Sequence, residues 1–136
     1  MKGVREGVDI IREKIRDRKT IRIISDYDVD GDVSNYILWK AIYDLGGMID
    51  FQIPDRMKDG YGINENIIEK AVEDQIDTIL TCDNGIAAAD AVAYGKEHGL
   101  TMIITDHHDV PFDTDEAGMR KEVLPPADVV INPKQE

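Results

Sequence analysis

The chain has 136 residues and a formal net charge of −12, from 16 Lys and Arg against 28 Asp and Glu. Hydrophobic residues make up 42% and charged residues 32%, which indicates one folded domain, or part of one, and excludes a compositionally disordered chain. The acidic excess argues against attachment to DNA or a membrane through a basic face, but not against nucleic-acid binding through metal ions. The sequence shows no apolar run of bilayer length and no signal peptide, and its single cysteine, Cys82, excludes an internal disulfide. We therefore expect a cytoplasmic protein with no membrane partner.

Predicted helices and strands alternate along the chain. Residues 2–18 are rich in Lys, Arg and Glu and predict an amphipathic helix whose buried stripe is Val4, Val8, Ile11 and Ile15. Short β-branched or apolar runs predict five strands, over residues 21–25, 48–54, 78–82, 100–105 and 128–131. The helices predicted between them start at Asp32 or Ser34, at an Asn64 N-cap, and at about residue 87.

The alternation predicts the fold class. Strands separated by helices of ten or more residues are typical of βαβ units, and continuous apolar strands indicate a sheet covered on both faces. We predict a doubly wound α/β domain with a mostly parallel five-stranded sheet and helices on both faces. The helix that ends at Gly46-Gly47 is apolar nearly all round, so we expect it to be deeply packed.

Residues 109–126 interrupt this pattern. They have no periodicity and contain three prolines, which predicts either a short helix around Glu116–Glu122 or a mobile flap. The sequence then ends directly after the last predicted strand, an ending typical of a cut through a larger protein.

Three polar clusters each follow a predicted strand: residues 26–32, 82–85 and 106–109. The carboxyl ends of parallel strands lie along one edge of a sheet, where ligands of such folds bind. We therefore expect these clusters to converge, although they are distant in sequence. A cluster of Asp side chains together with His is a typical ligand set for Mn²⁺, and Mg²⁺ is also possible. Enough ligands are present for two such ions, which can activate a water for attack on a phosphoryl group.

Each cluster also has a simpler interpretation. The first resembles half of an EF-hand loop, but the twelfth position from Asp26, which requires Glu, is Ile37. Asp83-Asn84-Gly85 alone is typical of a turn, and His107-His108 of a polar loop. The convergence of all three favours metal binding. Outside them, we expect His98 to be solvated or paired with a helix dipole, and Cys82 to pack in the sheet.

At these residues the sequence resembles the DHH phosphoesterase superfamily and, within it, the RecJ-like single-strand-specific exonucleases. The similarity runs from about residue 21 to 134 and rests on four ordered motifs and an ending: residues 26–31, 53–62, 81–86, 104–108 and 131–134. It implies that residues 21–136 are the phosphoesterase domain, incomplete at its C-terminal end, and the predicted amphipathic helix in residues 1–20 precedes this domain. In the family a further motif supplies another metal-binding Asp, and a second domain grips nucleic acid.

The resemblance also implies roles for individual residues. Asp28 and Asp30 would each bind a metal ion, Asp83 would bridge two Mn²⁺ or Mg²⁺ ions, and His107 would complete one site. His108 would contact the scissile phosphate, as the second catalytic residue beside Asp83. Asp26 and Asp106 would be supporting acids that do not bind the metal ions directly. Arg56 and Tyr61 would contact the substrate. Many superfamily members have a histidine where this chain has Ile24, a difference that argues against the pyrophosphatase branch.

Three functions remain open from the sequence. The first is a metal-dependent exonuclease that digests single-stranded DNA from its 5′ end. The second is a phosphodiesterase of oligoribonucleotides or cyclic dinucleotides, which Tyr27 disfavours because those relatives usually carry Pro there. The third is a non-catalytic module that binds DNA or protein, against which the intact acids and histidines argue.

Overall fold

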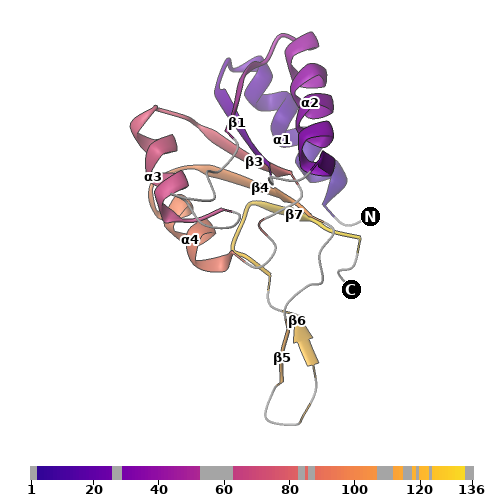
Figure 1. Cartoon of the computed structure of the whole chain (residues 1–136), viewed down its shortest axis with the longest axis vertical. Coiled ribbons are helices and arrows are strands. Elements are labelled where there is room, and N and C mark those ends of the chain that lie inside the picture. The colour runs from indigo at the N-terminus through magenta and orange to yellow at the C-terminus, as the bar shows by residue number, and fades with distance from the viewer. Residues whose placement is uncertain are drawn as a thin grey trace.

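Five parallel strands form the central sheet of the computed structural model, in the order β2-β1-β3-β4-β7 (Figure 1). The structure describes residues 3–25, 29–52, 63–82, 85, 88–106, 112–114, 118, 120–122 and 124–133. The sheet strands are β1 (Thr20–Ser25), β2 (Met48–Gln52), β3 (Thr78–Cys82), β4 (Thr101–Thr105) and β7 (Val129–Ile131). The helices are α1 (Val4–Arg16), α2 (Val29–Asp44), α3 (Glu65–Glu73) and α4 (Ala89–Glu97). The predicted α/β class and five-stranded parallel sheet are confirmed.

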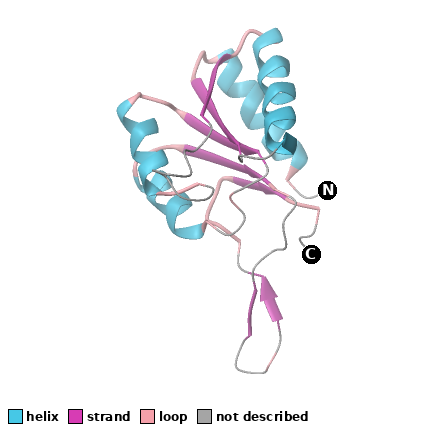
Figure 2. Ribbon diagram, in the orientation of Figure 1, coloured by secondary structure: helices cyan, strands magenta, loops and turns pink. Residues whose placement is uncertain are grey.

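Helices cover both faces of the sheet, α1 and α2 on one side and α3 and α4 on the other (Figure 2). Alternate residues of each strand point to opposite faces, so the strands contribute to two apolar cores. On the α3–α4 side the buried strand residues are Ile24, Ile79, Met102 and Ile104. On the α1–α2 side they are Ile21, Ile23, Leu80, Cys82, Ile103 and Val129. This double burial explains why the strands are continuous apolar runs.

A buried arginine ties the edge strand β2 to the sheet. Arg22 of β1 donates from Nε and Nη2 to the Asp50 carboxylate, at 3.0 and 2.9 Å. Asp74 directly follows α3, and its Oδ2 lies 3.0 Å from Arg22 Nη1. The two side chains form an ion pair without hydrogen-bond geometry. The hydrogen bonds that Arg22 donates to the Asp50 carboxylate raise the pKa of Arg22, against the opposing effect of burial. The guanidinium therefore links strands and helix with its charge compensated.

The helices α1 to α4 end in the same motif. After α1, Lys19 N–H donates to Lys14 O and Arg18 N–H to Ile15 O, the two hydrogen bonds of a Schellman motif. The equivalent pairs follow α2, α3 and α4. The motif requires a left-handed residue after the helix, and Gly46 and Gly99 occupy that position after α2 and α4. After α1 and α3 the same conformation is adopted by Arg18 (φ 55°) and Gln75 (φ 60°).

Two glycines let α1 approach the last strand of the sheet. A Cβ on Gly3 would lie 2.6 Å from Val130 O, and one on Gly7 would lie 3.1 Å from Ile131 Cδ1. A side chain at Gly3 would therefore collide with the β7 backbone. Further along α1, Ile10, Ile11 and Ile15 pack against the core beneath α2.

The structure corrects four details. Residues 120–122 form strand β6 (Arg120–Glu122), which pairs antiparallel with β5 (Phe112–Thr114), so the helix predicted around Glu116–Glu122 is wrong. Val4 and Val8 are exposed, because α1 turns Gly7, Ile11 and Ile15 toward the core instead.

The other two corrections concern α2, which begins at Val29, before Asp32 or Ser34. It is not deeply packed: among its described side chains only Ile42 is fully buried, because the sheet covers one side of the helix and the other faces outward. No helix in the described part of the chain is both long and apolar enough to cross a bilayer.

Candidate functional site

The strands that precede the three polar clusters end in one row. In the sheet register, Ser25 pairs with Cys82, Cys82 with Thr105, and Thr105 with Ile131. Residues 26–28, 83–84 and 106–108 directly follow these positions, so all three clusters leave the sheet at the same edge. Adjacent strands lie about 5 Å apart, so the strand ends Ser25, Cys82 and Thr105 lie within about 10 Å of one another. This row is the geometric basis for a shared site.

Two of the predicted site residues lie within the described part of the chain. Asp30 is the second residue of α2, so it lies at the start of a helix and not in the loop expected from the sequence. Asp106 directly follows β4 and is 7% exposed. The remaining seven lie outside the described residues: Asp26, Asp28, Arg56, Tyr61, Asp83, His107 and His108. Their roles, and those of Asp30 and Asp106, stay predictions.

Hydrogen bonds fix the edge directly beneath the second and third clusters. Thr105 N–H donates to Thr81 Oγ1 at 3.1 Å, and the Thr105 hydroxyl donates to the carbonyl oxygen of Thr81. Asp106 N–H donates to Ile131 O at 3.1 Å, which extends the ladder between β4 and β7 by one residue. These bonds hold the strand ends from which Asp83 and His107 follow in a fixed relative position.

Gly85, two residues after Asp83 in the sequence, packs closely against the sheet. Its φ of 103° lies in a region that L side chains rarely adopt. A Cβ there would lie 3.1 Å from Ile104 Cδ1 and 3.2 Å from Thr81 Oγ1. The backbone therefore packs against the ends of β3 and β4 two residues after Asp83.

Sequence reasoning gave no role to three residues at this edge: Thr81, Thr105 and Asn132. Asn132 is 1% exposed, directly after β7. Their positions in the sequence could have indicated a role, because each is a polar residue near or directly beyond the end of an apolar strand.

The electrostatic environment of this edge follows from the topology. The helices that follow β1, β2 and β3 begin here, so the partial positive charge of their amino termini lies at this edge. Asn64 caps α3 by accepting a hydrogen bond from Ile67 N–H at 3.1 Å, as predicted. A hollow of about 330 Å³ separates the starts of α3 and α4, with Ile63, Asn64 and Ala88 in its lining. This environment favours anions such as phosphate groups once cations offset the acidic clusters.

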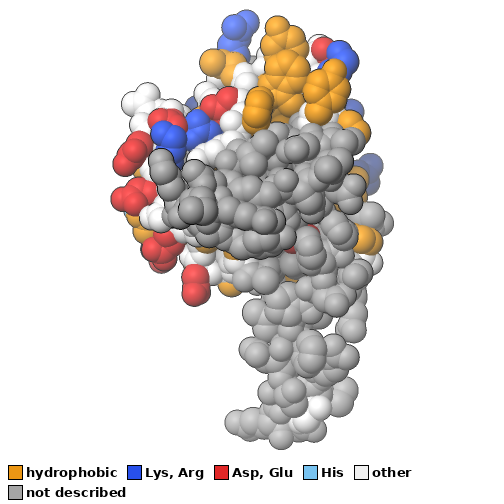
Figure 3. All heavy atoms as spheres, in the orientation of Figure 1, with side chains coloured by type: hydrophobic (Ala, Val, Ile, Leu, Met, Phe, Trp, Pro, Cys, Tyr) orange, Lys and Arg blue, Asp and Glu red, His pale blue; other side chains and the backbone are white. Residues whose placement is uncertain are grey.

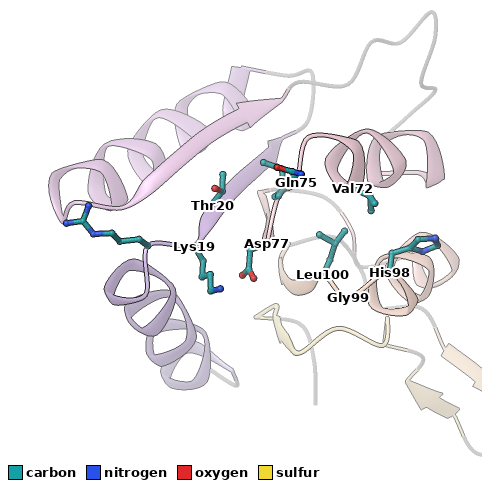
Figure 4. Close-up of a pocket in the computed structure, with 10 residues that line it drawn as sticks. Lys19, Thr20, Val72, Gln75, Asp77, His98, Gly99 and Leu100 are labelled. Atoms are coloured by element: carbon teal, nitrogen blue, oxygen red, sulfur yellow. The ribbon is translucent and has the colours of Figure 1, made fainter.

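A second pocket lies at the opposite edge of the sheet, where α1, α3 and α4 end (Figure 4). It has a volume of about 360 Å³, and its lining includes Lys19, Gln75, Asp77 and His98. His98 is exposed and its ring nitrogen Nδ1 lies 2.8 Å from Tyr94 O, at the carboxyl end of α4 as expected. The two predicted site residues that the structure describes, Asp30 and Asp106, are not among the residues that line this pocket.

The donor set suits hard divalent cations. Carboxylates and imidazoles are typical ligands of Mn²⁺, and carboxylates of Mg²⁺. Within the ranges that the structure describes, no three His, Cys, Asp or Glu side chains form a metal-binding group. Three of the four predicted ligands, Asp28, Asp83 and His107, lie outside those ranges, and the strand ends that precede them are in register.

Comparison with known proteins agrees with this arrangement. Residues 20–136 match the family described as "DHH family, N-terminal domain". The chain belongs to the DHH family. The family match begins at β1, so α1 lies before the matched residues.

Several relatives are single-stranded-DNA-specific exonucleases RecJ. The protein of Bacillus subtilis is 39% identical over 99% of this chain and 16% of its own length. Those of Haemophilus influenzae and Escherichia coli are both 34% identical, over 96% and 98% of this chain and 21% and 22% of their own lengths. The chain thus spans about a fifth of the length of these relatives.

Solved structures show the same fold. A crystal structure of exonuclease RecJ bound to manganese superimposes with a TM-score of 0.82 and 32% identity, over 98% of this chain and 31% of that one. RecJ from Thermus thermophilus, in complex with Mn²⁺, gives a TM-score of 0.76 and 28% identity, over 98% of this chain and 17% of that one. The parallel sheet and its covering helices are therefore the DHH-family arrangement.

Proposed function

We propose that this chain carries the metal-binding part of a RecJ-like phosphodiesterase that digests single-stranded DNA from the 5′ end. One observation supports this most strongly: the strands that precede all three acidic and histidine clusters end in a single register row. The DHH-family match, and the relatives that act on single-stranded DNA, support the same substrate class.

In this proposal, Asp28 and Asp30 would each hold one Mn²⁺ or Mg²⁺ ion, Asp83 would serve both ions, and His107 would complete one site. When bound, the ions would supply an activated water and neutralise charge on the phosphoryl group. His108 contacts the scissile phosphate, and Arg56 and Tyr61 contact the neighbouring nucleotide. Asp26 and Asp106 orient the ligands by hydrogen bonding without touching the ions.

The domain organisation belongs to the same proposal. Residues 21–136 would be a phosphoesterase domain that a further motif and a nucleic-acid-binding domain complete. The acidic surface of this part, with its net charge of −12, would then be offset by the ions and by basic residues elsewhere. A cytoplasmic location follows from the substrate and stays a prediction.

Calorimetric titration with Mn²⁺ tests the proposal on the 136-residue chain. We expect binding that Asp83→Ala weakens by about 100-fold or more, since a bridging carboxylate serves both ions. Asp90→Ala is the matched control, because Asp90 is an exposed acid at the start of α4, on the same edge of the sheet but outside the motifs. Equal loss in both variants would show general charge attraction and contradict a specific site.

Digestion assays then identify the substrate. The proposal predicts Mn²⁺-dependent shortening of 3′-labelled single-stranded DNA, lowered by two orders of magnitude or more in Asp83→Ala. Faster cleavage of short RNA or a cyclic dinucleotide would favour the second hypothesis. DNA binding without cleavage, in a chain that binds Mn²⁺, would favour a non-catalytic role.

A further inference from the structure

Two threonines join the ends of β3 and β4 through their side chains. The Thr81 hydroxyl accepts a hydrogen bond from Thr105 N–H at 3.1 Å, and the Thr105 hydroxyl donates to the carbonyl oxygen of Thr81. Each side chain therefore bonds to the backbone of the other residue, from one strand to the next. At the opposite end of β3, by contrast, the Thr78 hydroxyl donates at 2.6 Å to Asp77, its own neighbour in the chain.

The two hydroxyls lie on opposite faces of the sheet. Leu80 and Cys82 point to the α1–α2 side, and alternate residues of a strand point to opposite faces, so Thr81 points to the α3–α4 side. Ile104 also points to the α3–α4 side, so Thr105, the next residue, points to the α1–α2 side. The pair therefore holds the ends of β3 and β4 together from both faces of the sheet.

Thr81 also contacts the chain between β3 and α4. Its side chain is fully buried, and a Cβ placed on Gly85 would lie 3.2 Å from Thr81 Oγ1. Gly85, three residues beyond Cys82, thus lies again beside the end of β3, and its carbonyl oxygen accepts a hydrogen bond from Ala88 N–H at 3.1 Å. Asp83 lies between Cys82 and Gly85 in the sequence. Thr81 is therefore in contact with the chain two residues beyond this acid.

The spacing in the sequence connects the threonines to two of the proposed metal ligands. Asp83 follows Thr81 by two residues, and His107 follows Thr105 by two residues. Metal sites require ligand distances within about 0.2 Å of their ideal values. Groups that orient ligands without touching the ion typically change metal affinity by about 10-fold to 100-fold. The spacing of the two strand ends can therefore act on metal affinity, although neither threonine binds an ion.

We propose that Thr81 and Thr105 are positioning residues, which set the distance between Asp83 and His107 and thereby the affinity for Mn²⁺ or Mg²⁺. This inference rests on the function proposed above, in which Asp83 serves both ions and His107 completes one site. The ion that both residues hold depends directly on the spacing between the ends of β3 and β4, and the other ion depends on it less. Loss of the threonine hydrogen bonds should therefore weaken one binding step more than the other.

Calorimetric titration of threonine variants with Mn²⁺ tests this proposal. Figure 3 shows Asp and Glu side chains over α3 and α4, which attract cations in general, and an exchange of Thr for Val leaves that attraction unchanged because it alters no charge. Thr81→Val and Thr105→Val should each weaken one binding step by about 10-fold, and the double variant by about 100-fold or more. Thr81→Ser and Thr105→Ser keep the hydroxyls and should retain the Mn²⁺ affinity of the unsubstituted chain.

Thr78→Val is the matched control. Thr78 and Thr81 are both fully buried in β3, and both hydroxyls take part in a hydrogen bond. Thr78→Val and Thr81→Val should therefore lower the urea midpoint of unfolding by similar amounts. Because Thr78 lies at the end of β3 away from the polar clusters, its exchange should leave Mn²⁺ affinity unchanged. Circular dichroism confirms that each variant is folded, and the single variants carry the comparison if the double variant does not fold.

Two results would overturn the proposal. The first is Mn²⁺ affinity in Thr81→Val and Thr105→Val equal to that of the unsubstituted chain. The second is an equal loss in Thr78→Val, which would show that affinity follows overall stability and not the spacing of the strand ends. Failure of the proposed function is distinguishable, because Mn²⁺ binding would then be absent or independent of Asp83 in the first place, and both proposals would fall together.

Discussion

Gly99 tests how much the left-handed helix ends contribute to stability. Its φ is 83°, and a Cβ placed on it would meet no atom within 4 Å. Gly99→Ala therefore changes no packing and isolates the cost of a side chain in left-handed backbone. That cost is about 1–2 kcal/mol, partly offset because alanine also restricts the unfolded chain, so we expect a net loss of about 1 kcal/mol.

The reverse substitutions should stabilise the chain. Arg18 and Gln75 hold the same position of the same motif after α1 and α3, with a side chain where glycine is preferred. Arg18→Gly and Gln75→Gly should each raise the free energy of unfolding by up to about 1 kcal/mol. Gln75→Ala is the control: both residues carry a Cβ, so the backbone cost is unchanged.

Urea denaturation followed by far-ultraviolet circular dichroism measures these changes as shifts in midpoint at constant slope. A change of 1 kcal/mol corresponds to roughly 3–5 °C in Tm for a chain of this length. The reasoning is refuted if Gly99→Ala is neutral, or if Gln75→Gly and Gln75→Ala have the same effect.

Two further predictions concern acid stability and the site. Burial tends to raise the pKa of Asp77, but hydrogen bonds from Lys14 and Thr78 and the charge of Lys14 outweigh it, so the pKa falls below its ordinary value of 3.8. The carboxylate therefore stabilises the fold above about pH 4 and loses this contribution as the pH drops further. Lys14→Met should flatten the dependence of the unfolding free energy on pH between about 5 and 3. An unchanged pH profile in this variant would contradict the prediction. Gly85→Ala should lower the free energy of unfolding by about 1–3 kcal/mol, since it adds backbone strain at a positive φ to close contacts with Ile104 and Thr81. It should also weaken Mn²⁺ binding, which calorimetry measures. Unaltered Mn²⁺ affinity in a destabilised variant would show that Gly85 supports the fold but not the metal site.

Much of the fold was predictable because each strand carries its own boundary signals. The run Thr78–Cys82 was predicted to the residue, and the Asn64 cap and the glycine stop after α2 are confirmed. The order of the strands in the sheet was not predicted, because no local signal in the sequence shows which strands lie side by side.

Errors arose where burial depends on distant residues. The apolar composition of α2 predicted deep packing, but composition does not reveal that one side of the helix lies beyond the reach of the sheet. Val4 and Val8 fit a helical stripe, yet Gly7 faces β7, because close approach selects the residue without a side chain. The segment around residue 120 contains strand β6, whose pairing with β5 is not encoded in local periodicity.

The sequence predicted where the candidate site lies in the fold better than it predicted how its side chains are arranged. Parallel topology predicts that the three clusters meet at one edge, and the register of Ser25, Cys82 and Thr105 places the strand ends that precede them in one row. The Thr81–Thr105 hydrogen bonds that hold the edge were not predicted, because threonine in a strand is also an ordinary β-former. Individual ligand roles still rest on the resemblance to the DHH family.

The contact of α1 with β7 has a consequence for synthesis on the ribosome. Gly3 and Gly7 pack against Val130 and Ile131, so α1 docks on a strand that is made more than 120 residues later. Contacts of such long sequence separation form late in folding, since the intervening chain must be ordered first. The apolar face of α1 therefore stays without its final partner while residues 20–128 are translated, and chaperones can bind it during that time.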